Sequence, residues 1–349
     1  MADEPLRIGI LGASRIAPAA IIRPAQALGH DLIVVGARDV DRATSYAAEH
    51  GIKRAYGSYE EVLTDPEVEM VYNGLPNGLH GPWNLAAIAA GKHVLGEKPF
   101  ASNATEAAEV GVAAQASGLV VTEAFHYRYH PLMLRLEELL DAGELGEVTR
   151  AEIDMLMPPP APADPRWSLA LAGGSLMDVG CYALDLARLL GRWLGGAPRI
   201  MHASAVQDRA NPGVDAELTA RLAYPSGATA LVRSGMRHRT LRFGFRIHGT
   251  AGSIEAPAFV LPMNDDRLII WHKMRGWPWR RRRVEHMGTT ATFVYQLQAF
   301  AAAVRQGAPL RVGLRDAIEQ MSLIDATYEA AGMTPRPVFS AALRDRPPG

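Results

Sequence analysis

Cysteine and net charge are both scarce in this chain. Cys181 is the one cysteine among 349 residues, so an intramolecular disulfide is impossible and a reducing compartment is expected. The formal net charge is −1 at pH 7, which provides no overall field to attract nucleic acid or an anionic membrane. We therefore expect neither of these as a partner.

Long hydrophobic runs and metal-binding patterns are absent as well. No stretch reaches about 18 uninterrupted apolar residues, so a membrane-spanning helix is not expected. The first residues, MADEPLRIGILG, are acidic and lead directly into an apolar run, whereas a secretory signal begins with basic residues. The 11 histidines are scattered, and no Cys/His spacing typical of zinc occurs. The sequence thus predicts a cytoplasmic protein without a metal centre.

Basic residues gather in one place, RGWPWRRRRVEH at residues 275–286. A run of like charges is usually a solvated hairpin or loop, and a contact with an anion or another subunit is the alternative. The sequence leaves the role of arginines 280–283 open.

The order of the apolar runs predicts an α/β fold with two domains, because the length exceeds what one core ordinarily supports. In the first part, short β-rich runs alternate with helices, one of them capped by Ser58, which is typical of crossover units and a parallel sheet. The five strands are expected at 6–11, 31–37, 69–76, 92–99 and 119–125.

After Phe125 the rhythm changes. A proline-rich loop at 158–165 precedes a long helix that ends at Gly191, and strand-like runs separated by turn signals follow between 198 and 272. Two helices, near 290–306 and 313–332, close the chain. This second part is expected to be α+β with a mostly antiparallel sheet.

The ends of the parallel strands are where such a sheet binds ligands. After the first strand, GILGASRIAPA places Gly12, Ser14 and Ala17 at the three glycine positions of a dinucleotide fingerprint. Gly12 permits the tight turn, and Ser14 is small enough for a pyrophosphate to approach the helix N-terminus. Arg15 and Ile16 of the same turn are further expected cofactor contacts. Without its context, a plain strand–helix turn would explain the pattern equally well.

The second strand ends in GARD, with Arg38 near the position where an NAD-binding site usually carries an acid. An arginine there can hold a 2′-phosphate, which favours NADP over NAD. The alternative is a surface arginine paired with Asp39 or Asp41.

Three more strand ends carry polar residues. GLPNGLH at 74–80 contributes Leu75, Pro76, Asn77 and His80 as expected cofactor contacts, although Asn77 could form a local turn and His80 could be a cap.

GEKPF follows, with Glu97 and Lys98 as further expected cofactor contacts before the rigid Pro99. A lysine salt-bridged to Glu97 is the structural alternative. The fifth end, TEAFHYRYHP, brings Glu123, Arg128 and His130 together.

Taken in order, GILGASRIA, ARD, LPNGLH, GKHVLGEKP, EAFHYRYHP and GGSLMDVGCY are similar to the landmarks of the glucose–fructose oxidoreductase / inositol dehydrogenase / MocA-like family. The resemblance implies an N-terminal Rossmann dinucleotide-binding domain at 1–125 and a C-terminal α+β domain at 126–349 with a large, mostly antiparallel open sheet. It also implies that one face of that sheet makes the contacts of a homodimer or homotetramer, and that Lys98 reaches the substrate beside the nicotinamide.

The long helix supplies the partners of this lysine. Asp178 and Tyr182 lie four residues apart and share a helix face, which Asp185 extends. That face would be solvated unless a ligand or domain covers it, and by resemblance it looks into the active site. Many family members carry histidine where this chain has Tyr182, and others carry tyrosine. A tyrosine base needs a lowered pKa, which the nearby Lys98 would favour.

The resulting hypothesis is hydride transfer between NADP, preferred over NAD, and a secondary alcohol or hemiacetal carbon of a sugar, polyol or cyclic diol. Tyr182 and Lys98 would transfer the proton and polarise the oxygen, in roles that could be exchanged, and Asp178 would orient the substrate. Arg128, Arg166 and Trp167 are further candidate substrate contacts, although loop packing is the preferred interpretation of the last two. A non-catalytic NAD(P)-binding regulator and an NAD-dependent glycosidase are the alternatives.

Overall fold

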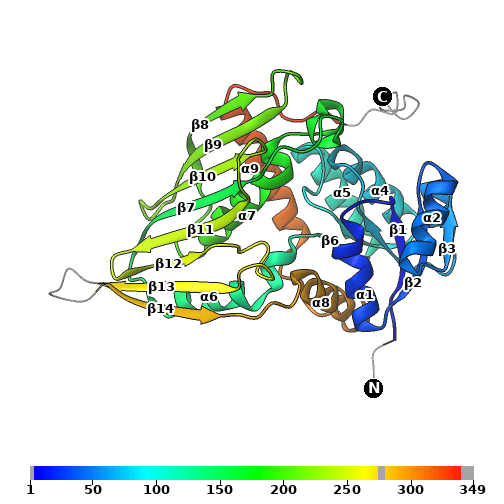
Figure 1. Ribbon diagram of the computed structural model, residues 1–349, viewed down its shortest axis with the longest axis horizontal. Coiled ribbons are helices and arrows are strands. Elements are labelled where there is room, and N and C mark those ends of the chain that lie inside the picture. Colours follow the sequence, from blue (N-terminus) through cyan, green and yellow to red (C-terminus); the bar gives the residue numbers. More distant parts are fainter. Residues whose placement is uncertain (1–3, 274–279, 339–349) are drawn as a thin grey trace.

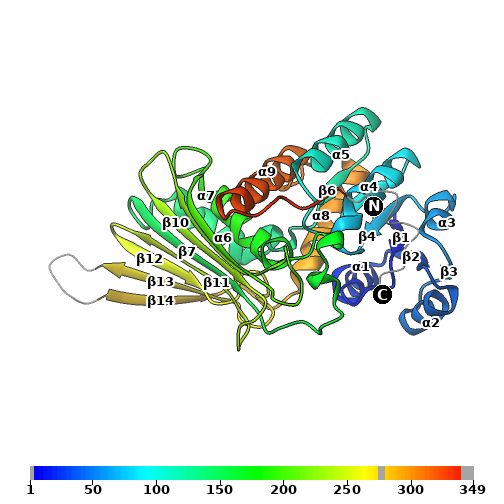
Figure 2. The same ribbon diagram turned by 90° about the horizontal axis from the view of Figure 1, so that it is seen from above.

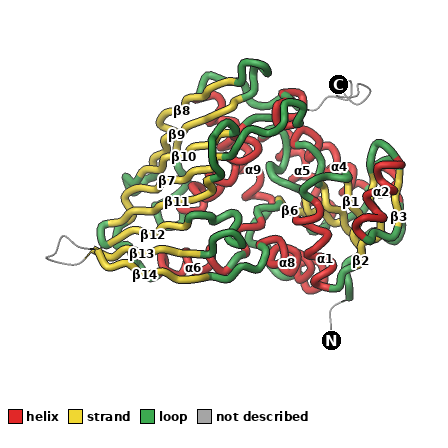
Figure 3. The backbone as a smooth tube through the Cα atoms, viewed as in Figure 1, coloured by secondary structure: helices red, strands yellow, loops and turns green. Residues whose placement is uncertain are grey.

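The computed structural model describes residues 4–273 and 280–338. Within these ranges it contains a six-stranded and an eight-stranded sheet, which lie side by side with helices between and around them (Figures 1 and 3). The first sheet is built from chain before residue 125 and the second from chain after it. The predicted fold class is therefore confirmed.

The six-stranded sheet is parallel throughout and has the order β3-β2-β1-β4-β5-β6. Its strands are β1 Arg7–Leu11, β2 Asp31–Gly36, β3 Arg54–Tyr56, β4 Met70–Asn73, β5 His93–Gly96 and β6 Val121–Glu123. The sequence prediction lacked β3, because three half-buried residues are too few to show a pattern. The strand order reverses between β1 and β4, which is where open α/β sheets bind ligands.

The helices of this part are a π-helical turn Pro18–Ile22 continued by α1 Arg23–Leu28, α2 Val40–His50, α3 Tyr59–Thr64, α4 His80–Ala89 and α5 Ala104–Ser117. The predicted cap of α3 is present: Ser58 Oγ accepts from the backbone N–H of Glu61 at 3.2 Å. Gly51, with a φ of 69°, ends α2 in the left-handed conformation that glycine adopts most readily.

The eight-stranded sheet has the order β14-β13-β12-β11-β7-β10-β9-β8 and is antiparallel except for the pair β7–β10. Its strands are β7 Val148–Leu156, β8 Arg199–Gln207, β9 Asp215–Ala223, β10 Thr229–Gly235, β11 Arg242–Gly249, β12 Gly252–Ala256, β13 Arg267–Lys273 and β14 Arg280–His286. Arginines 280–283 begin β14, an edge strand that pairs antiparallel with β13 as a hairpin would, and residues 275–279 of the basic run lie outside the described residues. Charge on an edge strand discourages pairing with another sheet.

Helices α6 Pro131–Asp141, α7 Cys181–Leu190 and α9 Leu314–Ala330 lie on one face of this sheet, and no helix of the described residues covers its other face (Figure 2). A π-helical turn, Leu176–Gly180, precedes α7 and packs closely on β10, because a Cβ added to Gly180 would lie 2.8 Å from the Cβ of Ser234. The stretch Leu169–Leu190 is long and apolar enough to cross a membrane by composition, but 83% of its most apolar window is buried inside the protein. It is the central core helix of the second part.

Helix α8 Thr292–Gln306 returns to the first part of the chain. Its Phe293, Leu297 and Phe300 are buried in the same apolar cluster as Ile8 and Ile10 of β1. The second part is therefore tied to the first by a shared core in addition to the connection after β6.

Candidate active site

The carboxyl ends of the parallel strands meet at one edge. The register pairs Leu11 with Asn73, and Asn73 with Gly96. Gly96 in turn pairs with Glu123. The loops that start after these residues, including the fingerprint turn and GEKPF, are therefore neighbours at the edge of the sheet.

The fingerprint turn has the geometry that its sequence predicts. Gly12 has a φ of 95°, and a Cβ added there would lie 2.8 Å from Leu75 Cδ2, so a larger residue would not fit. Ser14 Oγ is buried without a hydrogen-bond partner. A buried hydroxyl left unpaired is costly, and a cofactor phosphate approaching this turn would satisfy it. The exposed Arg15 and Ile16 follow directly.

The end of β2 presents two arginines, Arg38 and Arg42, and the acid beside them, Asp39, caps α2. The carboxylate of Asp39 accepts from the backbone N–H groups of Asp41 at 2.9 Å and Arg42 at 3.1 Å, as a helix cap. Among the described residues Arg38 therefore forms no ion pair, and the predicted alternative of pairing with Asp39 or Asp41 is wrong. Arg42, which sequence reasoning missed, donates from Nη2 to the carbonyl of Ala13 at 2.7 Å. Its position four residues after Arg38 was the available signal.

Lys98 points across the edge of the sheet to the π-helical turn. Its Nζ donates to the backbone carbonyl of Asp178 at 2.6 Å, lies 3.7 Å from Asp178 Oδ1 and is 5.2 Å from the ring centroid of Tyr182. Glu97 instead accepts from the hydroxyl of Tyr72 at 2.9 Å. The simple alternative of a lysine salt-bridged to Glu97 is therefore not what the structure shows.

Lys98 is held as a cation. Burial on its own would lower the pKa of Lys98, but the nearby acids, above all Asp178, outweigh it and the pKa is raised. The side chain retains 13% exposure, so it is not fully enclosed.

Tyr182 is buried, and its hydroxyl lies 3.0 Å from Nε2 of His126. Burial and the neighbouring Glu97 raise the pKa of Tyr182 well above its ordinary value. The lowered pKa expected for Tyr182 is therefore not found in the free protein: burial and the neighbouring acid outweigh the charge of Lys98, and Tyr182 is a neutral phenol. His126 was not among the predicted site residues.

Asp178 is bound from two sides. Besides Lys98, Arg166 donates from Nε to Asp178 Oδ2 at 2.6 Å and from Nη1 to Asp164 Oδ1 at 3.2 Å. Asp164 also pairs with Arg15 of the fingerprint turn. A chain of alternating charges thus connects the expected phosphate site to the lysine, and the loop before the helix joins the two halves of the chain.

Two of the tentative substrate contacts have other partners. Trp167 packs in an apolar cluster with Val214, Ala216 and Met236, which favours the loop-packing interpretation. Arg128 is buried.

The side chains that contact Arg128, Asp185 and Tyr127, are both buried. Arg128 Nη1 donates to Asp185 Oδ1 at 3.1 Å, and the hydroxyl of Tyr127 donates to Asp185 Oδ2. Asp185 therefore does not extend the face of Asp178 and Tyr182 towards a ligand, and this buried pair argues against a substrate contact by Arg128.

The loop after β4 contacts the loop that carries Lys98 and the segment before the π-helical turn. Both ring nitrogens of His80 contact backbone carbonyls, those of Pro99 at 2.6 Å and Leu75 at 2.7 Å, so His80 braces the lysine loop and has no nitrogen left for a cofactor. Asn77 Nδ2 donates to the carbonyl of Ala172 at 3.2 Å, a contact between the two halves of the chain rather than a local turn. Pro76 precedes this contact.

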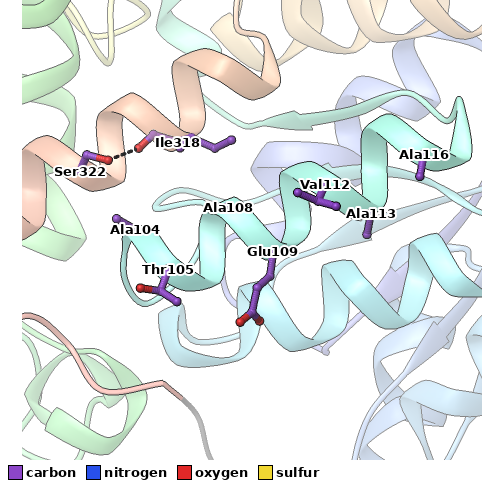
Figure 4. A pocket seen from close by; sticks show the side chains of 9 residues that line it. All are labelled: Ala104, Thr105, Ala108, Glu109, Val112, Ala113, Ala116, Ile318 and Ser322. Atoms are coloured by element: carbon purple, nitrogen blue, oxygen red, sulfur yellow. Dashed lines mark hydrogen bonds between the residues drawn. The ribbon is translucent and has the colours of Figure 1, made fainter.

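Two other kinds of site come into question, a surface groove and a metal centre. A groove of about 780 Å³ runs between α5 and α9, and its lining residues come from those two helices rather than from the strand ends (Figure 4). Residues 4–273 and 280–338 contain no group of three or more His, Cys, Asp or Glu side chains that could hold a metal ion.

Comparison with known proteins agrees with this geometry. Residues 6–125 match the model of an oxidoreductase family with an NAD-binding Rossmann fold, and residues 133–255 match the GFO/IDH/MocA C-terminal domain. Over 329 residues the chain is 39% identical to D-xylose 1-dehydrogenase (NADP(+)) 2 from Haloferax volcanii, which covers 93% of this chain and 97% of that protein.

Two further relatives are a diol dehydrogenase and a ketoreductase. Trans-1,2-dihydrobenzene-1,2-diol dehydrogenase from Bos taurus is 37% identical over 226 residues, 64% of this chain and 65% of that protein. The crystal structure of a 3-ketoreductase from Actinomadura kijaniata in complex with NADP and TDP-benzene has a TM-score of 0.85 at 27% identity, and covers 94% of this chain and 98% of that one.

Proposed function

This chain belongs to the Gfo/Idh/MocA family of NAD(P)-binding oxidoreductases, and on that basis we propose that it interconverts a secondary alcohol or hemiacetal of a sugar, polyol or cyclic diol with its carbonyl form. One observation carries the proposal. The Lys98 ammonium and the Tyr182 phenol lie side by side, beyond the strand ends that carry the nucleotide fingerprint.

The roles of the two side chains follow from their protonation. A bound nicotinamide supplies or accepts the hydride. Lys98, whose pKa is raised above its ordinary value, donates a hydrogen bond to the reacting oxygen and stabilises negative charge there. Tyr182, a neutral phenol in the free protein, gives its proton to that oxygen in reduction and takes it back in oxidation. Asp178 holds the ammonium in place.

The proposed cofactor is NADP rather than NAD. The support is that Arg38 has no ion-pair partner among the described residues and that Arg42 lies against the fingerprint turn at Ala13. Two guanidinium groups that form no ion pair among the described residues match a 2′-phosphate, whereas the ribose hydroxyl of NAD favours a carboxylate acceptor.

The substrate class rests on the relatives. One relative is named a D-xylose 1-dehydrogenase and another a trans-1,2-dihydrobenzene-1,2-diol dehydrogenase, and a sugar, polyol or cyclic diol is proposed as the substrate here. A non-catalytic regulator would not need Lys98 and Tyr182 together. A glycosidase would use the same fold but leave the cofactor unchanged overall, and the experiment below separates it.

We also propose a cytoplasmic homodimer or homotetramer. The buried free thiol of Cys181 is compatible with a reducing compartment, and the face of the eight-stranded sheet that carries no helix is the proposed contact (Figure 2). Light scattering of the purified chain tests the assembly, and a monomer at micromolar concentration would contradict it.

The function is tested by fluorescence titration with NADPH and NADH, followed by absorbance at the nicotinamide band against sugars, inositols and cyclic diols. We expect tighter binding of NADPH, and turnover of at least one substrate class. Lys98→Ala should keep NADPH binding and lose about 10²- to 10³-fold in turnover, the cost of one preorganised donor.

Lys53→Ala is the matched control, because Lys53 is an exposed lysine that pairs with Asp31 on the surface. Nucleotide binding without net turnover would favour the regulator or, if glycosides are cleaved, the glycosidase. No binding of either nucleotide would refute the interpretation of the fingerprint turn.

A further inference from the structure

His126 lies directly behind Tyr182, in a short helical turn after β6. Its Nε2 is 3.0 Å from the Tyr182 hydroxyl and its Nδ1 is 2.7 Å from the hydroxyl of Thr292 at the start of α8. The ring packs against Phe293, with ring centroids 3.9 Å apart. All of these residues are buried, so solvent does not compete for the hydrogen bonds.

The number of hydrogens in this group limits what it can do. Burial, together with the charge of Lys98, lowers the pKa of His126 to about 3, so the imidazole is neutral and has one N–H. If Nδ1 carries it, Nε2 must accept the Tyr182 hydrogen and turn it away from the substrate. If Nε2 carries it, Nδ1 accepts from Thr292 and the phenolic hydrogen stays free.

We propose that His126 is a positioning residue for Tyr182: its Nε2–H donates to the phenol oxygen, the Thr292 hydroxyl holds that tautomer, and the phenolic hydrogen is left to face the substrate. The inference rests on the proposed function and adds to it two residues, His126 and Thr292, that the sequence alone did not single out as site residues.

The proton balance of the step is simple. In reduction, the O–H bond of Tyr182 breaks and its proton forms the new hydroxyl of the substrate, while the hydride from the nicotinamide reaches the carbon. The phenolate that remains accepts the hydrogen bond of His126 Nε2–H and faces the ammonium of Lys98. His126 neither gains nor loses a proton, and oxidation reverses every step.

A donor is needed at this place because most groups around Tyr182 oppose its ionisation. The titratable groups that face it are Tyr72 from β4, Glu97 and Lys98 after β5, His126 and Tyr127 after β6, and Asp178 and Cys181 from its own helix. Lys98 is the cation of this set. The N–H of His126 is therefore the second favourable contact of the phenolate.

The direct test reads the tautomer and needs no turnover. In the full-length chain with ¹⁵N-labelled histidine, the His126 signals are assigned by their loss in His126→Phe, a change that keeps an aromatic ring against Phe293. We expect a neutral imidazole protonated at Nε2, and protonation at Nδ1 would overturn the proposal. Because this result does not depend on a substrate, it separates the failure of the proposal from the failure of the proposed function.

The kinetic test uses the pH dependence of the oxidation rate, which rises as Tyr182 becomes the phenolate. His126→Phe should shift the profile to higher pH by about one unit, the effect of losing one hydrogen bond to the ion. It should lower kcat about 10- to 100-fold with KM and NADPH binding nearly unchanged.

His126→Gln provides the rescue, because its amide nitrogen can occupy the place of Nε2 and donate. We expect this variant to restore most of the pH profile, and Thr292→Val to shift it part of the way to that of His126→Phe. An unshifted profile in His126→Phe, or equal losses in the Phe and Gln variants, would show that the ring only fills space.

Discussion

The buried ion pair between Arg336 and Asp215 offers the sharpest test of how the helix that carries Tyr182 is held. The two side chains are 1% and 0% exposed. Arg336 also donates to the carbonyl of Gly213 at 2.9 Å and to the hydroxyl of Tyr328 at 2.9 Å. The segment after α9 is thereby connected to the start of β9 through the carboxylate of Asp215.

The carboxylate of Asp215 also binds the start of the π-helical turn Leu176–Gly180. Asp215 Oδ2 accepts from the hydroxyl of Ser175 at 2.8 Å and from the backbone N–H of Leu176 at 2.8 Å. Leu176 begins the π-helical turn that carries Asp178. Loss of the network should therefore affect stability and, through the helix start, the position of Asp178 and Tyr182.

Arg336→Met removes the cation and leaves an ionised carboxylate in the interior. Breaking a buried pair from one side costs about 3–5 kcal/mol, and we expect the lower end, because Ser175, Leu176 and Tyr328 still donate to Asp215. At a slope of about 3 kcal/mol per molar urea, the unfolding midpoint should fall by about 1 M.

The assay is urea unfolding followed by circular dichroism. The double variant Asp215→Asn/Arg336→Met should cost less than the sum of the single changes, since no charge is left unpaired. Arg315→Met is the control, because Arg315 is 91% exposed and its pair with Glu319 should contribute less than about 1 kcal/mol. A loss below about 1 kcal/mol for Arg336→Met would refute the reasoning.

Three further predictions concern the cofactor, the link between the two halves and the pH dependence of stability. Arg42→Ala should weaken NADPH binding about 10- to 100-fold, the value of one charge-assisted hydrogen bond, and leave NADH nearly unchanged in the same titration; equal losses for both would contradict a contact with the 2′-phosphate. Asp164→Asn breaks the link between Arg15 and Arg166, and should lower the midpoint of thermal unfolding while raising the KM for the nucleotide; an unchanged KM would separate the link from the cofactor. Burial raises the pKa of Asp325 to about 6, so the folded protein binds a proton that the unfolded chain has released above about pH 4, and stability falls as pH rises through this window. Asp325→Asn should be more stable than the wild type by about 1 kcal/mol at pH 7 and show no gain at pH 4, and a gain independent of pH would show that the carboxylate is not the cause.

Local patterns explain why much of the site was predictable. The strand–turn–helix at Gly12, the cap at Ser58 and the rigid end of β5 at Pro99 depend on residues next to each other in the chain. Parallel strands bring their carboxyl ends together whatever the details of packing, so Lys98 could be placed at the ligand edge without coordinates.

The errors arose where a residue's partner is distant in the chain. Helical spacing groups Asp185 with Asp178, but spacing does not show that Arg128 would occupy it from another element. A lowered pKa for Tyr182 followed from the charge of Lys98 alone, whereas the raised pKa reflects burial beside Glu97.

What the sequence by itself determined is the order of elements and the kind of chemistry at the strand ends, because turns, caps and alternation are set by neighbours along the chain. What only the tertiary structure decided is which groups share the interior with Tyr182. His126 is 56 residues from Tyr182 and 166 residues from Thr292, and no local pattern connects them. Proton transfer depends on burial, charge and hydrogen bonds at single atoms, and these exist only once distant segments have packed together.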